Sequence, residues 1–157
     1  MTALTDPDCT LDGQRILLSR LPLLSSQEIA QIVGLHSPDL HTSPAQAYHW
    51  TLERLPLDTL RCSLDTGDEP VGGWKAAYLR HQASDAEAVR NGSPEYAGRQ
   101  AWCAQWVKNT AVYPLCVVHE AGEYWLWDGH HRLASAFWHE VLEVMAFVGF
   151  RGEDRVD

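Results

Sequence analysis

Runs of positive charge are missing from this sequence. Nowhere do three Lys or Arg residues follow one another, and 12 basic residues stand against 21 acidic ones, giving a net charge of −9. Lys and Arg displace the counterions around nucleic-acid phosphates, so proteins that bind nucleic acid usually carry a basic patch or stripe. The composition therefore argues against a nucleic-acid partner, except through a local positive cleft.

Paired cysteines and long apolar runs are also missing. The four cysteines form no Cys-x-x-Cys pair and no zinc-type grouping with histidines, so we expect reduced, free thiols. No apolar run approaches the roughly 18 residues that a membrane span needs. The first residues lack the charged and apolar regions of a signal peptide. We therefore expect a cytoplasmic protein with no membrane partner.

The chain has enough residues for a real core. Its 157 residues are 45% hydrophobic, which is typical of one globular domain. We see no internal repeat and no low-complexity segment. The pattern predicts three parts: an N-terminal helical extension over residues 1–47, a main domain over residues 48–150 and a charged tail over residues 151–157. The extension is too short to bury a core alone.

A helix start is the clearest feature of the extension. Ser25 and Glu28 stand three residues apart, as in a capping box, in which each side chain accepts a hydrogen bond from the other's backbone N–H. Ile29, Ile32 and Val33 then recur at helical spacing and predict the buried face of that helix.

The main domain alternates β-rich and helical patterns. Pro- and Gly-containing turns separate these segments, and Glu120–Glu123 has the composition of a hairpin turn. Trp102, Trp106 and Trp138 are assigned to the core. Together the pattern predicts a mixed α/β or α+β fold with a small mixed sheet and packed helices. Strands are expected over residues 50–55, 113–119, 124–127 and 142–150, and helical segments over 74–80, 85–90, 95–108 and 131–139.

The turn Asp128-Gly129-His130-His131-Arg132 is the strongest functional signal. A short aromatic strand precedes it and a helix-forming run follows. A strand that turns on glycine into a helix leaves the first backbone N–H groups of that helix without intrahelical acceptors, and the helix dipole favours an anion there. We expect a phosphate-binding site at this turn, formed by Gly129, His130, His131 and Arg132.

Each residue of the turn also has a simpler interpretation. Arg132 suits bidentate phosphate binding, or it pairs with a carboxylate. Gly129 allows close approach of a ligand, and it also suits a plain tight turn. Asp128 is a candidate catalytic residue and Mg²⁺ ligand, or it caps the helix. His130 and His131 are candidates for phosphate contact or proton transfer, although adjacent residues cannot both face one ligand on a regular turn.

The order of strand, hairpin, Asp-Gly-His-His-Arg-Leu-Ala turn, helix and final strand resembles the ParB/sulfiredoxin superfamily. The resemblance is strongest over residues 113–149 and weaker over 50–60. It implies the corresponding fold and a turn that holds nucleotide phosphates. Sulfiredoxin-like members carry Cys where this chain has His130, and partition-type ParB members carry a second Arg where it has His131. Because the sequence ends at Asp157, we do not expect their helix-turn-helix domain here.

The Asp-Gly-His-x-Arg form is similar to the free-serine-kinase branch, which implies a nucleotide-dependent kinase. Such an enzyme needs a carboxylate base, and we favour Glu69, with Asp65, Asp68 and Glu53 as alternatives. We therefore expect a nucleotide-binding phosphotransferase or hydrolase that uses Mg²⁺ with ATP, ADP or CTP and acts on a small hydroxyl compound. The alternatives are a ParB-like nucleic-acid-associated protein with a nucleotide switch, and a non-catalytic interaction domain of the same fold.

Overall fold

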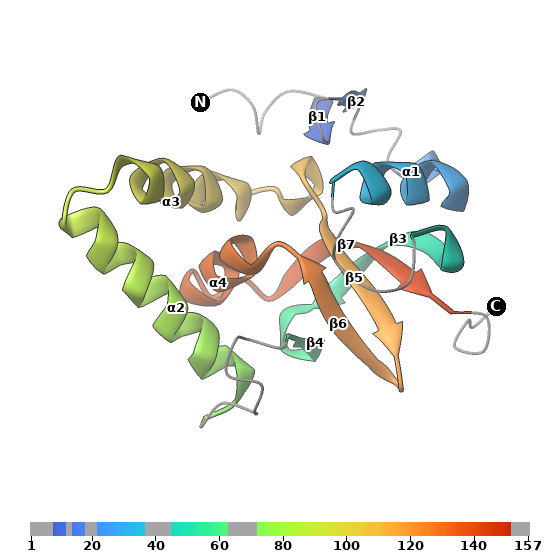
Figure 1. Ribbon diagram of the computed structural model, residues 1–157. Helices are drawn as coiled ribbons and strands as arrows, with labels where there is room; N and C mark the ends of the chain where they lie inside the picture. Colours follow the sequence, from blue (N-terminus) through green and yellow to red (C-terminus); the bar gives the residue numbers. More distant parts are fainter. Residues whose placement is uncertain (1–7, 12–13, 18–21, 37–44, 63–71, 152–157) are drawn as a thin grey trace.

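A central sheet with helices packed on it forms the fold (Figure 1). The computed structural model describes residues 8–11, 14–17, 22–36, 45–62 and 72–151. This part of the chain contains four α-helices and a five-stranded mixed sheet, which confirms the expected α+β class. None of its helices has the length and apolar character needed to cross a membrane.

The elements follow one another in a simple order. The strands are β1 (Asp8–Leu11), β2 (Gln14–Leu17), β3 (His49–Pro56), β4 (Leu60–Arg61), β5 (Leu115–Glu120), β6 (Glu123–Asp128) and β7 (Glu143–Phe150). The α-helices are α1 (Ser26–His36), α2 (Gly73–Arg90), α3 (Pro94–Trp106) and α4 (His130–Trp138). Short 3-10 turns cover Ala45–Ala47, Leu57–Thr59 and Thr110–Val112.

The main sheet has the strand order β3-β7-β5-β6-β4. β5 and β6 form the expected antiparallel hairpin, and β7 lies parallel to β5 and antiparallel to β3. The strands predicted from β-rich runs are therefore present, each within a few residues of its expected ends. The two-residue strand β4 completes the sheet beside β6. Because α4 connects β6 to β7, the Asp-Gly-His-His-Arg turn lies at the end of β6.

One helical prediction was wrong in a way that affects the site. The segments expected over residues 74–80 and 85–90 are one continuous helix, α2. The intervening residues, His81–Ser84, include neither Gly nor Pro, and Gln82 is buried, so nothing interrupts the helix. As a consequence, His81 and Asp85 stand one helical turn apart on the same face.

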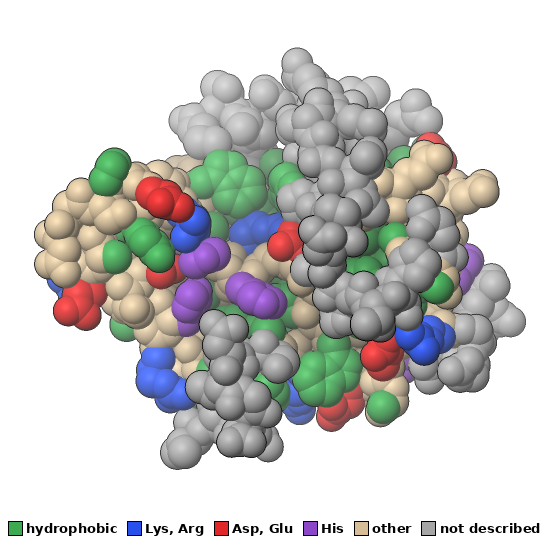
Figure 2. Space-filling model, in the orientation of Figure 1, with side chains coloured by type: hydrophobic (Ala, Val, Ile, Leu, Met, Phe, Trp, Pro, Cys, Tyr) green, Lys and Arg blue, Asp and Glu red, His purple; other side chains and the backbone are tan. Residues whose placement is uncertain are grey.

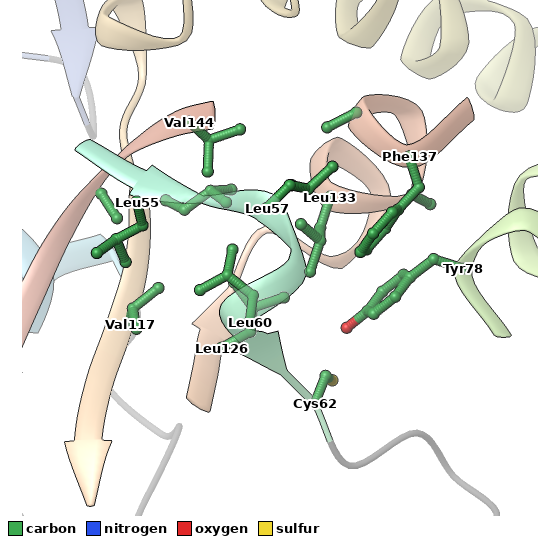
Figure 3. Close-up of a cluster of buried hydrophobic side chains, with 14 of the residues drawn as sticks. Leu55, Leu57, Leu60, Cys62, Tyr78, Val117, Leu126, Leu133, Phe137 and Val144 are labelled. Atoms are coloured by element: carbon green, nitrogen blue, oxygen red, sulfur yellow. The ribbon is translucent and has the colours of Figure 1, made fainter. Parts of the chain in front are cut away.

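Both faces of the sheet are covered. Side chains alternate along β5, so Val117 joins one core cluster while Cys116 and Val118 join the other. The first cluster receives residues of α2, α3 and α4, and Figure 3 shows part of it, with Tyr78 of α2 stacked against Phe137 of α4. The second cluster receives α1.

The helix of the N-terminal extension is part of this second cluster. The capping box is confirmed: the Ser25 N–H donates to Glu28 Oε1 and the Glu28 N–H donates to Ser25 Oγ, each over 3.1 Å. The predicted apolar face is buried as well. The extension is not wholly helical, because β1 and β2 form an antiparallel hairpin. Asp12-Gly13, between them in the sequence, is a typical hairpin-turn dipeptide and was the signal for it.

The tryptophans divide between core and surface. Trp106 is fully buried and Trp102 packs against the same cluster, as expected. The assignment of Trp138 to the core was wrong, because its side chain is 47% exposed. Trp138 is the last residue of α4, and the chain there turns away toward β7.

We predict that α1 contributes to the stability of the whole domain. Ile29→Ala should lower the free energy of unfolding by about 2–5 kcal/mol, because it leaves a cavity at a fully buried site. Gln31→Ala, on the exposed face of the same helix, should change it by less than about 0.5 kcal/mol. Chemical denaturation of both variants checks this. Equal stability of the two would mean that α1 packs loosely on the sheet.

Candidate functional site

Gly129 determines the shape of the turn between β6 and α4. It is the N-cap residue of α4 and has φ 112°, a left-handed conformation that side-chain-bearing residues rarely adopt. A Cβ atom there would overlap with Leu115 Cδ2 and would lie 3.0 Å from Arg132 Nη2. The turn therefore requires glycine for its backbone conformation and for its close packing against β5.

The N-cap residue of α4 is a glycine, so no N-cap side chain accepts a hydrogen bond from the first turn of the helix. The first helical hydrogen bond runs from the Leu133 N–H to the Gly129 carbonyl, so the helix supplies no acceptors for the N–H groups of residues 130–132. The interpretation of Asp128 as N-cap was wrong, since Gly129 is at that position. Asp128 instead lies 3.5 Å from Arg132 Nη2, measured from Oδ2.

The guanidinium of Arg132 is turned inward. The residue is only 7% exposed, and its Nη1 donates to the backbone carbonyls of Tyr113 and Pro114, the latter over 3.2 Å. It also lies over the Tyr113 ring, 4.5 Å from the centroid, and 5.5 Å from that of Trp106. Burial lowers the pKa of Arg132, and the nearby Asp128 carboxylate opposes that shift. Arg132 thus ties α4 to the chain that leads into β5, and its binding of phosphate stays a prediction.

The two histidines of the turn have different surroundings. His130 lies beside Cys62, with Nε2 3.5 Å from the sulfur. Cys62 is buried at the end of β4, close to the Tyr78 hydroxyl, whose pKa is raised by burial and by this thiol. His131 points instead toward α2 and α3. The two side chains therefore contact different parts of the protein, and which of them faces a ligand stays a prediction.

His131 is the centre of a polar cluster. Its Nδ1 lies 2.9 Å from Asp85 Oδ2 and 3.3 Å from His81 Nε2, both on α2. Its Nε2 lies 3.2 Å from Nη1 of Arg99, on α3. Arg99 also pairs with Glu95, with 3.1 Å between Nη2 and Oε1. Asp85 is only 5% exposed, whereas the side chains of His81 and His131 are about one-third exposed.

The contacts of His131 indicate its tautomer. A guanidinium only donates hydrogen bonds, so the Arg99 contact requires a lone pair on Nε2 of His131. The hydrogen of a neutral His131 then lies on Nδ1, where Asp85 accepts it. A buried carboxylate that orients an imidazole in this way is a common feature of catalytic and metal-binding histidines.

This cluster reaches the molecular surface. Figure 2 shows histidine side chains gathered where α2 and the start of α4 meet, with basic and acidic side chains beside them. The exposed share of His131 and His81 agrees with that view. A ligand from solvent therefore has access to the imidazoles, and it would reach the buried carboxylate of Asp85 only by way of them.

Sequence reasoning missed several of these residues. His81, Asp85 and Arg99 were not singled out, because α2 was divided into two segments and α3 was not placed against α4. The spacing of His81 and Asp85, four residues apart, was the available signal once a continuous helix is assumed. Glu53 lies in β3 and accepts a hydrogen bond from Thr51. Glu69, Asp65 and Asp68, proposed as bases, lie outside the described residues.

Comparison with known proteins adds a structural likeness at the level of solved structures. No protein-family model and no curated protein matches the chain. Among solved structures, sulfiredoxin from Arabidopsis thaliana matches with 14% sequence identity and a TM-score of 0.38. The match covers 62% of this chain and 83% of sulfiredoxin. A likeness of this size says nothing about activity or ligands.

Arg132 is expected to matter for stability. Arg132→Lys should lower the free energy of unfolding by about 1–3 kcal/mol, because the ammonium cannot replace the planar guanidinium that the buried carbonyls require. Arg90→Lys, exposed at the end of α2, serves as the control and should have no measurable effect. Thermal and chemical denaturation check this. If Arg132→Lys were as stable as the wild type, the buried guanidinium would not stabilise the turn as we infer.

Gly129 provides a second test of the turn. Gly129→Ala should destabilise the protein by about 1–3 kcal/mol, because of the positive φ and the contact with Leu115. Gly98→Ala, on α3 with open space around it, should instead stabilise by about 0.5–1 kcal/mol. Opposite signs in the two denaturation curves are the expected result, whereas two stabilised variants would show that the turn tolerates a side chain.

Proposed function

We propose that this protein binds a nucleotide or a related phosphate ester at the N-terminus of α4 and transfers or hydrolyses its terminal phosphate. The observation that carries the proposal is the first turn of α4, which follows a glycine N-cap, carries His130 and His131, and is approached by Arg99. Backbone N–H groups, the helix dipole and cationic side chains together favour a phosphate. Because the whole protein has a net charge of −9, this group of hydrogen-bond donors and cationic side chains differs from the overall charge of the chain.

The proposal gives the residues of the turn different roles. Gly129 allows the phosphate to approach the backbone, and His130, on the Cys62 side of the turn, contacts it through its partly exposed imidazole. His131, which faces α2 and α3, is a candidate for proton transfer. Arg132, whose guanidinium is buried, holds the turn in place, and its positive charge attracts the phosphate without direct contact. Asp128, whose side chain is 33% exposed, is the proposed ligand for a Mg²⁺ ion that bridges the phosphates.

Transfer would use an oxygen nucleophile. The hydroxyl of a small acceptor, or water, attacks the terminal phosphorus, and the bridging oxygen leaves with the rest of the nucleotide. Glu69 stays the proposed base. His131 is a second candidate, because Asp85 orients its ring and stabilises the imidazolium that forms when it accepts a proton.

Nucleotide titration with a charge-reversal variant tests the proposal. ATP, ADP and CTP, each with Mg²⁺, are titrated calorimetrically into the wild-type protein, and one of them should bind with micromolar affinity. His130→Asp should weaken that binding at least tenfold, because a carboxylate repels the phosphate while still suiting the first turn of a helix. Its melting temperature should not fall, which separates lost binding from lost folding.

His139→Asp is the matched control. It makes the same charge change at the exposed C-terminal end of α4, far from the first turn, and should leave nucleotide affinity within about twofold. No binding of any nucleotide to the wild type would refute the proposal. Binding of DNA instead, falling steeply with salt, would support the nucleic-acid alternative.

A further inference from the structure

We propose that His81, Asp85 and His131 form a binding site for one divalent transition-metal ion of the Zn²⁺ type. The three side chains come from α2 and from the first turn of α4. Within the described ranges they are the one group of three metal-ligating side chains that converge, with their donor atoms within 4.8 Å of one another. The inference concerns metal binding alone and does not rest on the proposed phosphate chemistry.

The spacing of the donor atoms fits a small ion. Zinc lies about 2.0–2.2 Å from nitrogen and oxygen ligands, so two ligands of a tetrahedral ion stand about 3.3–3.5 Å apart. The three separations are 2.9 Å between His131 Nδ1 and Asp85 Oδ2, 3.3 Å between the two imidazole nitrogens, and 3.8 Å between His81 Nε2 and Asp85 Oδ2. Shifts of a few tenths of an ångström bring all three into coordination.

A cation also suits the cluster better than a proton does. With its ring hydrogen on Nε2 instead, His131 offers an Nδ1 lone pair, and this atom forms a triangle with Asp85 Oδ2 and His81 Nε2 whose sides are 2.9, 3.3 and 3.8 Å. A hydrogen on His131 Nδ1 can point well at only one of its two neighbours. A metal ion at the centre of the triangle binds all three lone pairs at once.

Ligand type and exposure narrow the kind of site. Two imidazoles and one carboxylate suit Zn²⁺, Fe²⁺ or Co²⁺, whereas Mg²⁺ prefers oxygen ligands. The carboxylate is buried, but both imidazoles remain about one-third exposed. Three protein ligands with a solvent-facing side leave a fourth position for water or another small ligand, as in catalytic rather than structural zinc sites.

Arg99 opposes the metal in a specific way. When Nδ1 of His131 binds a metal, the ring hydrogen must move to Nε2, which the Arg99 guanidinium approaches within 3.2 Å. Two donors cannot share that contact, so the guanidinium must turn away, toward Glu95, which it already meets at 3.1 Å. Arg99 and the metal are therefore antagonists, and removing Arg99 should strengthen metal binding.

Zinc titration of the tag-free, metal-stripped protein tests the site. The wild type should bind one Zn²⁺ per chain with micromolar or tighter affinity in calorimetry without nucleotide. His81→Ala and Asp85→Asn should each weaken binding at least tenfold, and His139→Ala, which removes the exposed C-cap histidine that follows α4, should not. Circular dichroism confirms folding, and His81→Ala is the safer variant because that side chain is partly exposed.

Two further measurements test the site independently: the zinc affinity of Arg99→Ala and the visible absorption of bound Co²⁺. Arg99→Ala should bind Zn²⁺ severalfold more tightly than the wild type, the opposite sign to the ligand variants. Co²⁺ should give the intense visible absorption of a four-coordinate ion in the wild type, and this absorption should be lost in His81→Ala. Weak binding that all histidine variants share equally, or no binding by the wild type, would overturn the proposal and leave a hydrogen-bonded cluster.

The phosphate and metal proposals can fail separately. His130→Ala removes an imidazole proposed to contact phosphate but none of the three ligands, so it should keep its zinc affinity. Nucleotide binding with no zinc binding would overturn the metal site alone, and zinc binding with no nucleotide binding would overturn the proposed function alone.

Discussion

The inward guanidinium of Arg132 is the interaction on which the arrangement of the site depends. It joins the first turn of α4 to the backbone before β5, and it lies close to the rings of Tyr113 and Trp106, with Asp128 beside it. A buried cation is costly unless it is fully hydrogen-bonded, so the carbonyls and rings around it must hold their places. With that turn fixed, the side chains of His130 and His131 leave the same helix end in different directions.

The result is a helix end with two chemically distinct sides. On one side, His130 meets a buried thiol at the end of β4. On the other, His131 meets a carboxylate, a second imidazole and a guanidinium from two other helices. The proposed phosphate and metal sites use the same physical feature of this region, which is a set of preorganised donors and acceptors at a partly open surface. A metal at the second side would lie close to an anion bound at the helix end.

Local patterns in the sequence predicted much of the fold, and contacts between distant segments explain what they missed. Ser25 and Glu28 located the start of α1, and the apolar runs located β5, β6 and β7, because those signals act over a few residues. The partners of His131 come from residues 81, 85 and 99, which only the packing of α2 and α3 against α4 brings together. The inward direction of Arg132 likewise depends on Tyr113 and Trp106, whose rings the guanidinium contacts.

The position of β7 has a consequence for how the chain folds. It is the last strand in sequence, yet it lies inside the sheet and hydrogen-bonds to both β3 and β5. During synthesis from the N-terminus, β3 therefore has no strand to pair with until residues 143–150 have emerged. Until then, β5 can pair only with β6, its partner in the hairpin. Pairing over such long sequence separations is slow and leaves strand edges exposed. The nascent chain should thus be most prone to aggregation just before its last strand becomes available.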